Sequence, residues 1–234
     1  MSEGSSKRRP RGANDAARAD AAGRLILVRH GESEGNQVRQ FSVTPDIGLT
    51  ELGRLQAREA GRRIAELFRP SALVASSFRR ARLTAEIIAE EIGHAAPIAV
   101  EDDLRERSIG ELAGHSYDSM RRHPTFDSER WWDWRPPGGE SLTDVAERAA
   151  RVLVRLAASH PGEDVVVVSH GGVMLALCAH VEGGWYRPRV AGNCDLVVVT
   201  HAPDGTMRLD AVHACDVAAP GRSATGDGSG DASG

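Results

Sequence analysis

Residues 25–33 read Leu-Ile-Leu-Val-Arg-His-Gly-Glu-Ser. The four leading apolar residues predict a short buried strand, and the change to polar residues marks where that strand ends. Residues 165–172 repeat this design, with Val-Val-Val-Val followed by Ser-His-Gly-Gly. Because a strand of four valines has no polar face to turn toward solvent, we expect it at the centre of a parallel sheet.

Strands and helices alternate along the rest of the chain. Helical periodicity covers 50–68, 79–92, a segment that begins at Ser141, and 172–181, and apolar runs at 72–75 and 98–100 predict two more strands. The segments 196–200 and 207–212 flank a turn at 203–205 and predict a terminal hairpin. This order predicts an α/β fold, a three-layer sandwich whose mainly parallel central sheet is flanked by helices.

The two ends of the chain differ in composition from its middle. Residues 1–23 and 217–234 are mostly small, polar or charged, so neither segment can bury enough apolar surface to offset its chain entropy. We expect two disordered tails around one domain at 24–216. The basic run at 7–11 is either an address or anion-binding arm, or simply a solvated segment.

Composition argues against several classes of protein. The net charge of -4 gives no basic surplus for nucleic acid, and no apolar run is long enough to span a bilayer. Three widely spaced cysteines fit neither a disulfide framework nor a zinc site. We therefore expect a cytoplasmic protein without nucleic-acid or membrane partners. The hairpin should bring Cys194 and Cys215 near one another as reduced thiols.

Polar residues that could act in catalysis or bind a ligand follow each expected strand. His30 follows the first strand, Arg80 the second, Glu106 the third and His170 the valine strand. Because ligands of open α/β sheets bind at the carboxyl ends of the strands, we expect these residues to form one site.

A phosphoryl group suits this set of residues. Arg29 and Arg80 can each donate paired hydrogen bonds to phosphate oxygens. Gly31 and Gly171 let the backbone approach closely, and the helix starts that follow present free N–H groups.

The titratable residues divide into three roles. His30 is the expected nucleophile, since a neutral ring nitrogen can attack phosphorus. Glu106 is the expected acid for the leaving oxygen and could afterwards activate water. His170, when protonated, would hold the transferring group electrostatically. Neither histidine has an Asp or Glu at a ligand-like spacing, so we expect no metal.

The order of these motifs resembles that of the histidine phosphatase superfamily, also called the phosphoglycerate mutase-like family, over roughly residues 24–214. The resemblance implies a phosphoglycerate mutase-like fold, a phosphorylated His30, Glu106 as proton donor, and no metal or organic cofactor. It also implies that Arg29, Asn36, Arg80 and His170 bind the phosphoryl group. The matching motifs are Arg29-His30-Gly31-Glu32-Ser33 with Asn36, the segment 46–57, Arg80-Ala81-x-x-Thr84-Ala85, Leu104-x-Glu106 with Gly110 and Gly114, Gly139-Glu140-Ser141, and Ser169-His170-Gly171-Gly172.

Two residues depart from the pattern of the family, and one span of the chain has an unusual composition. Phe78 and Arg107 stand where the family usually has other residues, and Arg107 either reaches solvent or adds charge for a second anionic group on the substrate. The span 115–138 is short and carries Arg121, Arg122 and three tryptophans. We expect its arginines to form a substrate lid, with the alternative that its aromatic residues only cap the core.

The short span favours entry of water and therefore a phosphomonoester hydrolase that acts on a small phosphorylated metabolite. A phosphoglycerate mutase is the alternative within the same family. A catalytically silent protein that binds a phosphorylated ligand is the alternative of another class. The sequence leaves the natural substrate open, and it leaves open whether the protein is a homodimer.

Overall fold

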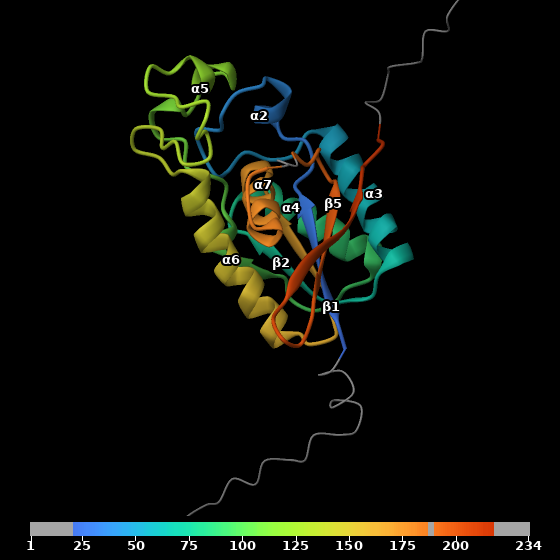
Figure 1. The fold of residues 1–234 in the computed structure, drawn as a ribbon. Coiled ribbons are helices and arrows are strands. Elements are labelled where there is room, and N and C mark those ends of the chain that lie inside the picture. The colour runs from blue at the N-terminus through green and yellow to red at the C-terminus, as the bar shows by residue number, and fades with distance from the viewer. Residues whose placement is uncertain (1–20, 187–189, 218–234) are drawn as a thin grey trace, which may run out of the picture.

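The computed structural model describes residues 21–186 and 190–217 (Figure 1). Most of both expected tails, including the basic run at 7–11, lies outside these residues. The first strand begins at Gly23, one residue before the expected start of the domain. None of the helices in the described ranges is long and apolar enough to cross a membrane.

Six strands form one sheet in the order β3-β2-β4-β1-β5-β6. The first four in this order are mutually parallel, and β5 and β6 are antiparallel to their neighbours. The valine strand β4 lies between β2 and β1 with every residue buried, which confirms its predicted central place. The strands are β1 (Gly23–Arg29), β2 (Pro70–Ser76), β3 (Ala99–Glu101), β4 (Asp164–Ser169), β5 (Leu196–His201) and β6 (Met207–His213).

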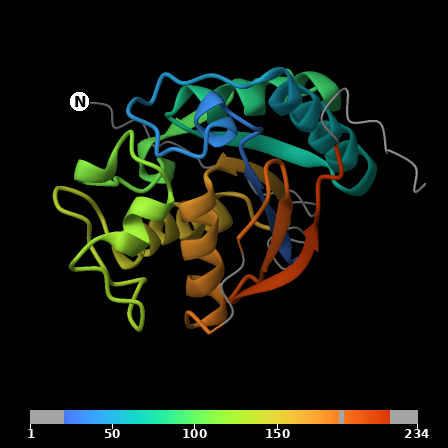
Figure 2. The same cartoon turned by 90° about the horizontal axis from the view of Figure 1, so that it is seen from above.

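Two pairs of helices cover the two faces of the sheet, so the fold is the predicted three-layer sandwich (Figures 1 and 2). On one face lie α3 (Glu51–Leu67) and α4 (Arg79–Ile92), and on the other α6 (Leu142–Ser159) and α7 (Gly171–Glu182). Along β1, Leu25 and Leu27 pack toward α6 and α7, whereas Ile26 and Val28 pack toward α3 and α4. Burial on both faces explains why this strand reads as a continuous apolar run.

Local signals at the helix ends have the expected effect. Thr50 caps α3 by accepting the Gly53 N–H at 3.0 Å, and Ser141 and Asp144 form a capping box at the start of α6. Gly93 ends α4 with φ of 67° in the left-handed region that glycine tolerates.

Short helical turns lie beyond the carboxyl ends of the strands, above the sheet in Figure 1. Sequence analysis missed them because elements of three to five residues are too short to show periodicity. They are α2 (Glu34–Gln37), η1 (Asp102–Leu104), η2 (Gly110–Leu112) and α5 (Asp118–Arg122).

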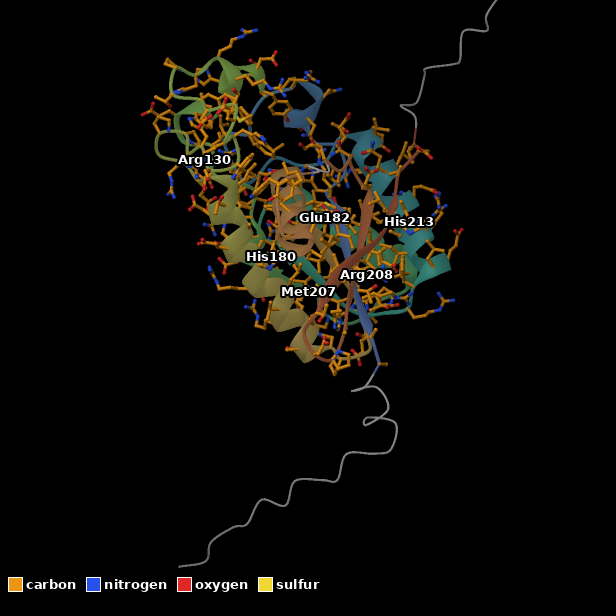
Figure 3. The ribbon with its side chains drawn as sticks, viewed as in Figure 1. Arg130, His180, Glu182, Met207, Arg208 and His213 are labelled. Carbon is orange, nitrogen blue, oxygen red and sulfur yellow. The ribbon has the colours of Figure 1, made fainter. Side chains whose placement is uncertain are left out.

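The predicted hairpin is formed by β5 and β6, and β6 is one edge of the sheet. Met207 packs against the core, while Arg208 points to solvent and pairs with Asp210 at 3.0 Å (Figure 3). Charged residues on an exposed edge strand discourage pairing with other chains. Cys194 and Cys215 belong to the same apolar cluster near the base of the hairpin, and the described cysteines are free.

The loop after β1 is pressed against the first turn of α3. A Cβ added at Gly53 would overlap the carbonyl oxygen of Glu32, and one added at Gly31 would overlap the carbonyl oxygen of Gly53. The two backbones are therefore in direct contact, and glycine is required on both sides.

We predict that Gly53→Ala lowers the free energy of unfolding by about 2 kcal/mol, although alanine is the better helix former by about 1 kcal/mol, because a backbone clash outweighs helix propensity. Urea denaturation measures the change. The exposed Arg63→Ala on the same helix serves as control and should change stability by less than about 0.5 kcal/mol. A Gly53→Ala protein as stable as wild type would contradict the contact.

Candidate active site

A cavity of about 690 Å³ opens at the carboxyl ends of the parallel strands. Its polar end brings together residues from β1, α4, the loop after β3 and the start of α7, as sequence analysis expected. Seven of the eleven predicted site residues line it: Arg29, His30, Asn36, Arg80, Glu106, Arg107 and Gly171. His170 lies against this group, with its ring centroid 5.1 Å from that of His30.

His30 is held as a neutral imidazole with one defined tautomer. Its Nδ1 lies 2.7 Å from the carbonyl oxygen of Gly31, which can only accept, so Nδ1 carries the proton. Its Nε2 therefore has a lone pair, and this nitrogen accepts from Nε of Arg80 at 3.0 Å. Burial, and next the charges of Arg80 and Arg29, lower the pKa of His30 well below the ordinary histidine value. The ring thus has an available nucleophilic nitrogen.

The two arginines beside His30 are only partly satisfied. Arg29 donates from Nη1 to the carbonyl oxygen of Ala191 at 2.7 Å, but its buried Nε has no partner. Arg80 is 3% exposed, and its buried Nη1 has no partner. Leaving buried charged donors unpaired is costly, so these groups are placed for an anion that completes their hydrogen bonds.

His170 also has an unpaired ring nitrogen. Its Nε2 lies 2.8 Å from Oγ of Ser76, and this oxygen accepts the N–H of Phe78, which leaves the serine hydroxyl free to donate to the ring. The proton of a neutral His170 then lies on Nδ1, which is buried without a partner. Burial, and then the charge of Arg80, lower the pKa of His170 well below its usual value. The conditional role of a protonated His170 stays a prediction, and burial favours the neutral ring, which offers one donor.

The carboxamide of Asn36 is connected to two residues that sequence analysis did not identify. Its Nδ2 donates to the Tyr117 hydroxyl at 3.1 Å, and its Oδ1 accepts from Nδ2 of Asn193 at 3.3 Å. Asn193 also donates to the carbonyl oxygen of His30 at 2.9 Å. Asn193 therefore links the loop before β5 to the backbone of the candidate nucleophile.

The glycines of the site lie close to other groups of the protein, so they allow close packing there. Gly31 is not among the described residues that line the cavity, its N–H donates to Thr84 at 3.1 Å and it packs against α3, so phosphate binding by Gly31 stays a prediction that this geometry does not support. At Gly172 an added Cβ would lie 2.6 Å from Oε1 of Glu106. Gly171 does line the cavity, and an added Cβ there would lie 3.4 Å from Nε of Arg29.

Glu106 reaches the cavity from the loop after η1. Its Oε1 accepts the N–H of Arg107 at 2.8 Å, and its Oε2 accepts the N–H of Gly172 at 3.3 Å, in the first turn of α7. The backbone of this loop and of the first turn of α7 therefore orients the carboxyl group toward the cavity.

A buried ion pair fixes the loop that carries Glu106. Arg148, 4% exposed on α6, binds Glu140 through Nε at 2.9 Å and Nη2 at 3.0 Å. The same guanidinium donates to the carbonyl oxygens of Asp103 at 2.7 Å and Glu106 at 3.3 Å. Sequence analysis noted Glu140 only as part of a motif, and it gave no signal for Arg148, which is 42 residues from Glu106.

Arg107 is turned inward and is only partly exposed. Its Nε donates to the carbonyl oxygen of Glu140 and its Nη2 to that of Trp134, both at 2.7 Å, and its guanidinium lies over the Trp134 ring. Burial lowers the pKa of Arg107 to about 10. Its guanidinium group is therefore held by carbonyl groups of the protein rather than extended into solvent. Most of this side chain serves to hold the span 134–140 against the acid loop.

The expected lid is divided between its aromatic and its basic residues. Trp131 and Tyr117 line the cavity, while Trp134 is buried against Phe126, so the aromatic residues serve both the cavity and the core. Arg121 and Arg122 are exposed on α5, outside the described residues that line the cavity. Their assignment as substrate-binding residues gains no support from this geometry.

Phe78, a departure from the family pattern, also contacts the site. Its ring lies 5.2 Å from the ring of His170 and 5.1 Å below the guanidinium carbon of Arg80. Phe78 therefore packs against two of the residues around His30.

The segment 31–35, Gly-Glu-Ser-Glu-Gly, matches the sequence pattern of a serine-hydrolase elbow, Gly-x-Ser-x-Gly. In the structure Ser33 is 1% exposed, and its hydroxyl donates to Oδ1 of Asn36 at 3.1 Å. Its backbone begins the short helix α2 rather than a turn that exposes the hydroxyl. Ser33 is therefore not an available nucleophile. Within 21–186 and 190–217, no group of three or more His, Cys, Asp or Glu side chains is arranged to hold a metal ion.

The fold and the cavity together define an α/β protein with a cavity at the carboxyl edge of its sheet, where Arg29 and Arg80 lie beside His30. Residues 25–212 match the histidine phosphatase superfamily (branch 1). The chain therefore belongs to this superfamily.

Relatives named as mutase or mutase-like and a solved structure named as a phosphatase resemble the chain. It is 38% identical to a 2,3-bisphosphoglycerate-dependent phosphoglycerate mutase from Methylobacterium sp. (strain 4-46), over 68% of this chain and 80% of the relative. It is 35% identical to phosphoglycerate mutase-like protein 4 of Arabidopsis thaliana, over 65% and 68%. A mycobacterial glucosyl-3-phosphoglycerate phosphatase, solved with VO3, superposes with a TM-score of 0.73 and 30% identity over 82% of this chain and 99% of its own.

We predict that acidification destabilises the protein through His30 and His170. Both have a folded pKa below the unfolded value of about 6.5, so the unfolded chain binds more protons as pH falls. The free energy of unfolding should drop below pH 6.5 by up to about 1.4 kcal/mol per pH unit for each histidine. Urea denaturation between pH 7.5 and 5 measures this drop. His170→Gln should reduce the slope, and the exposed His180→Gln should not; identical slopes in all three proteins would contradict the burial argument.

We predict that Arg148→Met lowers the free energy of unfolding by about 3 kcal/mol, because Glu140 loses its paired cation and two carbonyl groups lose their donor. Arg151→Met is the matched control on the same helix. Its side chain is 64% exposed and lies 3.8 Å from Asp103, so its loss should cost less than about 0.5 kcal/mol. Equal losses in thermal or urea unfolding would refute the role of the buried pair.

Proposed function

We propose that the chain is a phosphomonoester hydrolase that forms a phosphohistidine at Nε2 of His30. One observation carries this proposal: three buried donor nitrogens without partners belong to residues grouped around that ring. They are Nε of Arg29, Nη1 of Arg80 and Nδ1 of His170. A phosphoryl group has enough oxygens to satisfy all three while its phosphorus faces the ring nitrogen.

The first half of the proposed reaction moves the phosphoryl group to the enzyme. The Nε2 lone pair of His30 forms a bond to phosphorus as the bond from phosphorus to the ester oxygen breaks. Arg80, which donates to Nε2 in the free protein, shifts its hydrogen bond to a phosphoryl oxygen. Glu106 gives its proton to the leaving oxygen, and the product alcohol departs.

The second half releases phosphate. Water attacks phosphorus, Glu106 takes a proton from that water, and the bond from phosphorus to Nε2 breaks. The site then returns to its starting state with Glu106 protonated and His30 neutral. The sum is ester plus water giving alcohol plus inorganic phosphate, so atoms and charge balance.

The distribution of cations favours hydrolysis over mutase chemistry. A mutase that depends on a bisphosphate must hold a ligand with two phosphoryl groups. Beyond Arg29 and Arg80, the cationic side chains on the described cavity wall are Arg105 and Arg107. Arg105 pairs with Asp102 and Glu140, and Arg107 donates to two backbone carbonyl groups. A second phosphoryl group would have to displace these contacts.

We further propose that the substrate is a small phosphorylated metabolite rather than a nucleic acid or a membrane. The cavity volume suits a small organic ligand. A silent phospho-ligand binding protein is the less economical reading, because nucleophile, donors and candidate acid are all present on one cavity wall.

Rapid quench with ³²P-labelled 4-nitrophenyl phosphate tests the proposal. We expect label on the protein that acid releases and alkali spares, and we expect His30→Ala to abolish it and to lower kcat by more than about 1,000-fold. His180→Ala, an exposed histidine at the end of α7, is the matched control and should label like wild type (Figure 3). Label that survives His30→Ala would overturn the proposal. Transfer of label to added phosphoglycerate faster than to water would favour the mutase.

Glu106→Gln tests the proposed acid. We expect kcat/KM to fall by about 100-fold or more for an alkyl phosphate, whose leaving oxygen needs a proton. For 4-nitrophenyl phosphate, which has a stable leaving anion, the fall should be at least tenfold smaller. Equal losses on the two esters would show that Glu106 does not protonate the leaving group.

A further inference from the structure

The cavity extends beyond the residues around His30, and apolar side chains make up most of the rest of its wall, with the uncharged polar residues Gln40, Ser42, Thr44 and Ser108 among them. Phe41 and Tyr117 line this part with their ring centroids 5.0 Å apart, and Trp131 belongs to the same wall. Further apolar side chains on this wall are Val43, Met120, Leu175 and Val190. A site built to recognise a second anionic group would instead present convergent, unpaired cationic side chains here.

The charged residues on the described wall are already accounted for. Arg29 and Arg80 face the proposed phosphoryl position, and Glu106 is the proposed acid. Arg105 lies 3.2 Å from Asp102 and 3.3 Å from Glu140, so its charge is neutralised within the protein. Arg107 has two of its nitrogens committed to carbonyl groups. Beyond the proposed phosphoryl position, a carboxylate on the leaving group would therefore find no unpaired cationic side chain on the described wall.

The rim of the cavity exposes apolar side chains to water. Val43 is 69% exposed and Val190 is 74% exposed, although both line the cavity. When a ligand covers exposed apolar groups beside a cavity, their removal from water favours binding. The rim therefore favours a leaving group long enough to reach it.

We infer that the site selects phosphomonoesters of uncharged, apolar alcohols, with the alkyl or aryl group lying along the wall formed by Phe41, Val43, Tyr117, Met120 and Trp131. This inference rests on the proposed function, because it assigns the leaving group of that reaction. It separates the chain from enzymes whose substrate carries a carboxylate beside the phosphate. Val43 and Met120 act as specificity residues, since they touch the leaving group and not the phosphoryl group.

Primary alkyl phosphates from ethyl to hexyl test the inference, because their leaving oxygens are chemically alike and only apolar surface varies. A fully buried methylene changes kcat/KM by about fourfold, so hexyl phosphate should exceed ethyl phosphate by at least about 30-fold. 5-Carboxypentyl phosphate has the same chain length with a charged end. It should be at least about tenfold poorer than hexyl phosphate, because the carboxylate would lose water without gaining a partner.

Val43→Ser reports on the wall directly. It should lower the ratio of kcat/KM for hexyl over ethyl phosphate by about threefold or more, and its exposure keeps folding out of question. Val212→Ser is the matched control, because Val212 is 45% exposed on β6 and is not part of the described cavity wall. It should leave the ratio unchanged.

The outcomes separate this inference from the proposed function. Hydrolysis of the whole series at equal efficiency, or a preference for 5-carboxypentyl phosphate, would overturn the apolar leaving group while His30 still became labelled. Failure to release phosphate from any ester, together with no label on His30, would remove the proposed function and this inference with it.

Discussion

A guanidinium group that donates a hydrogen bond to a buried, neutral imidazole is the interaction on which the site depends. Nε of Arg80 lies 3.0 Å from Nε2 of His30, and both side chains are almost completely buried. Burial, and next the nearby positive charge, lower the pKa of the ring and keep its lone pair available, and the same charge would stabilise the oxygens of a group that the ring attacks. An anion that reaches the site would complete the hydrogen bonds of donor nitrogens that no protein group satisfies.

The fold supplies this arrangement through backbone geometry rather than through flexible side chains. In the β1–β4 register Arg29 lies opposite Ser169, so the histidine that follows each strand emerges at the same edge. The His30 N–H donates to the carbonyl oxygen of Ser169 at 2.9 Å, which ties the two strand ends together. Contact of the next residue with α3 then fixes where the chain turns away. Two apolar layers stabilise this edge from both faces of the sheet.

The sequence predicts most of the architecture, because burial on both faces leaves continuous apolar runs and the residues after such runs meet at one edge. Contacts that join distant segments, or that involve backbone groups, are harder to predict from the sequence. Nothing in the sequence indicates that Arg148 supports the acid loop, that Asn193 binds the His30 carbonyl group, or that Arg107 turns inward to carbonyl acceptors. Gly31 is a related case. A glycine there indicates a close approach of the backbone to another group, and in the structure that group is the backbone of α3 at Gly53.

A crystal structure of the protein with orthovanadate would test the central claim most directly, since vanadate adopts the geometry of a phosphoryl group under attack. We predict vanadium bonded to Nε2 of His30, with its oxygens accepting from Nε of Arg29, Nη1 of Arg80 and Nδ1 of His170. Vanadate bound elsewhere, or bound in the cavity while those three nitrogens stay unpaired, would contradict the account.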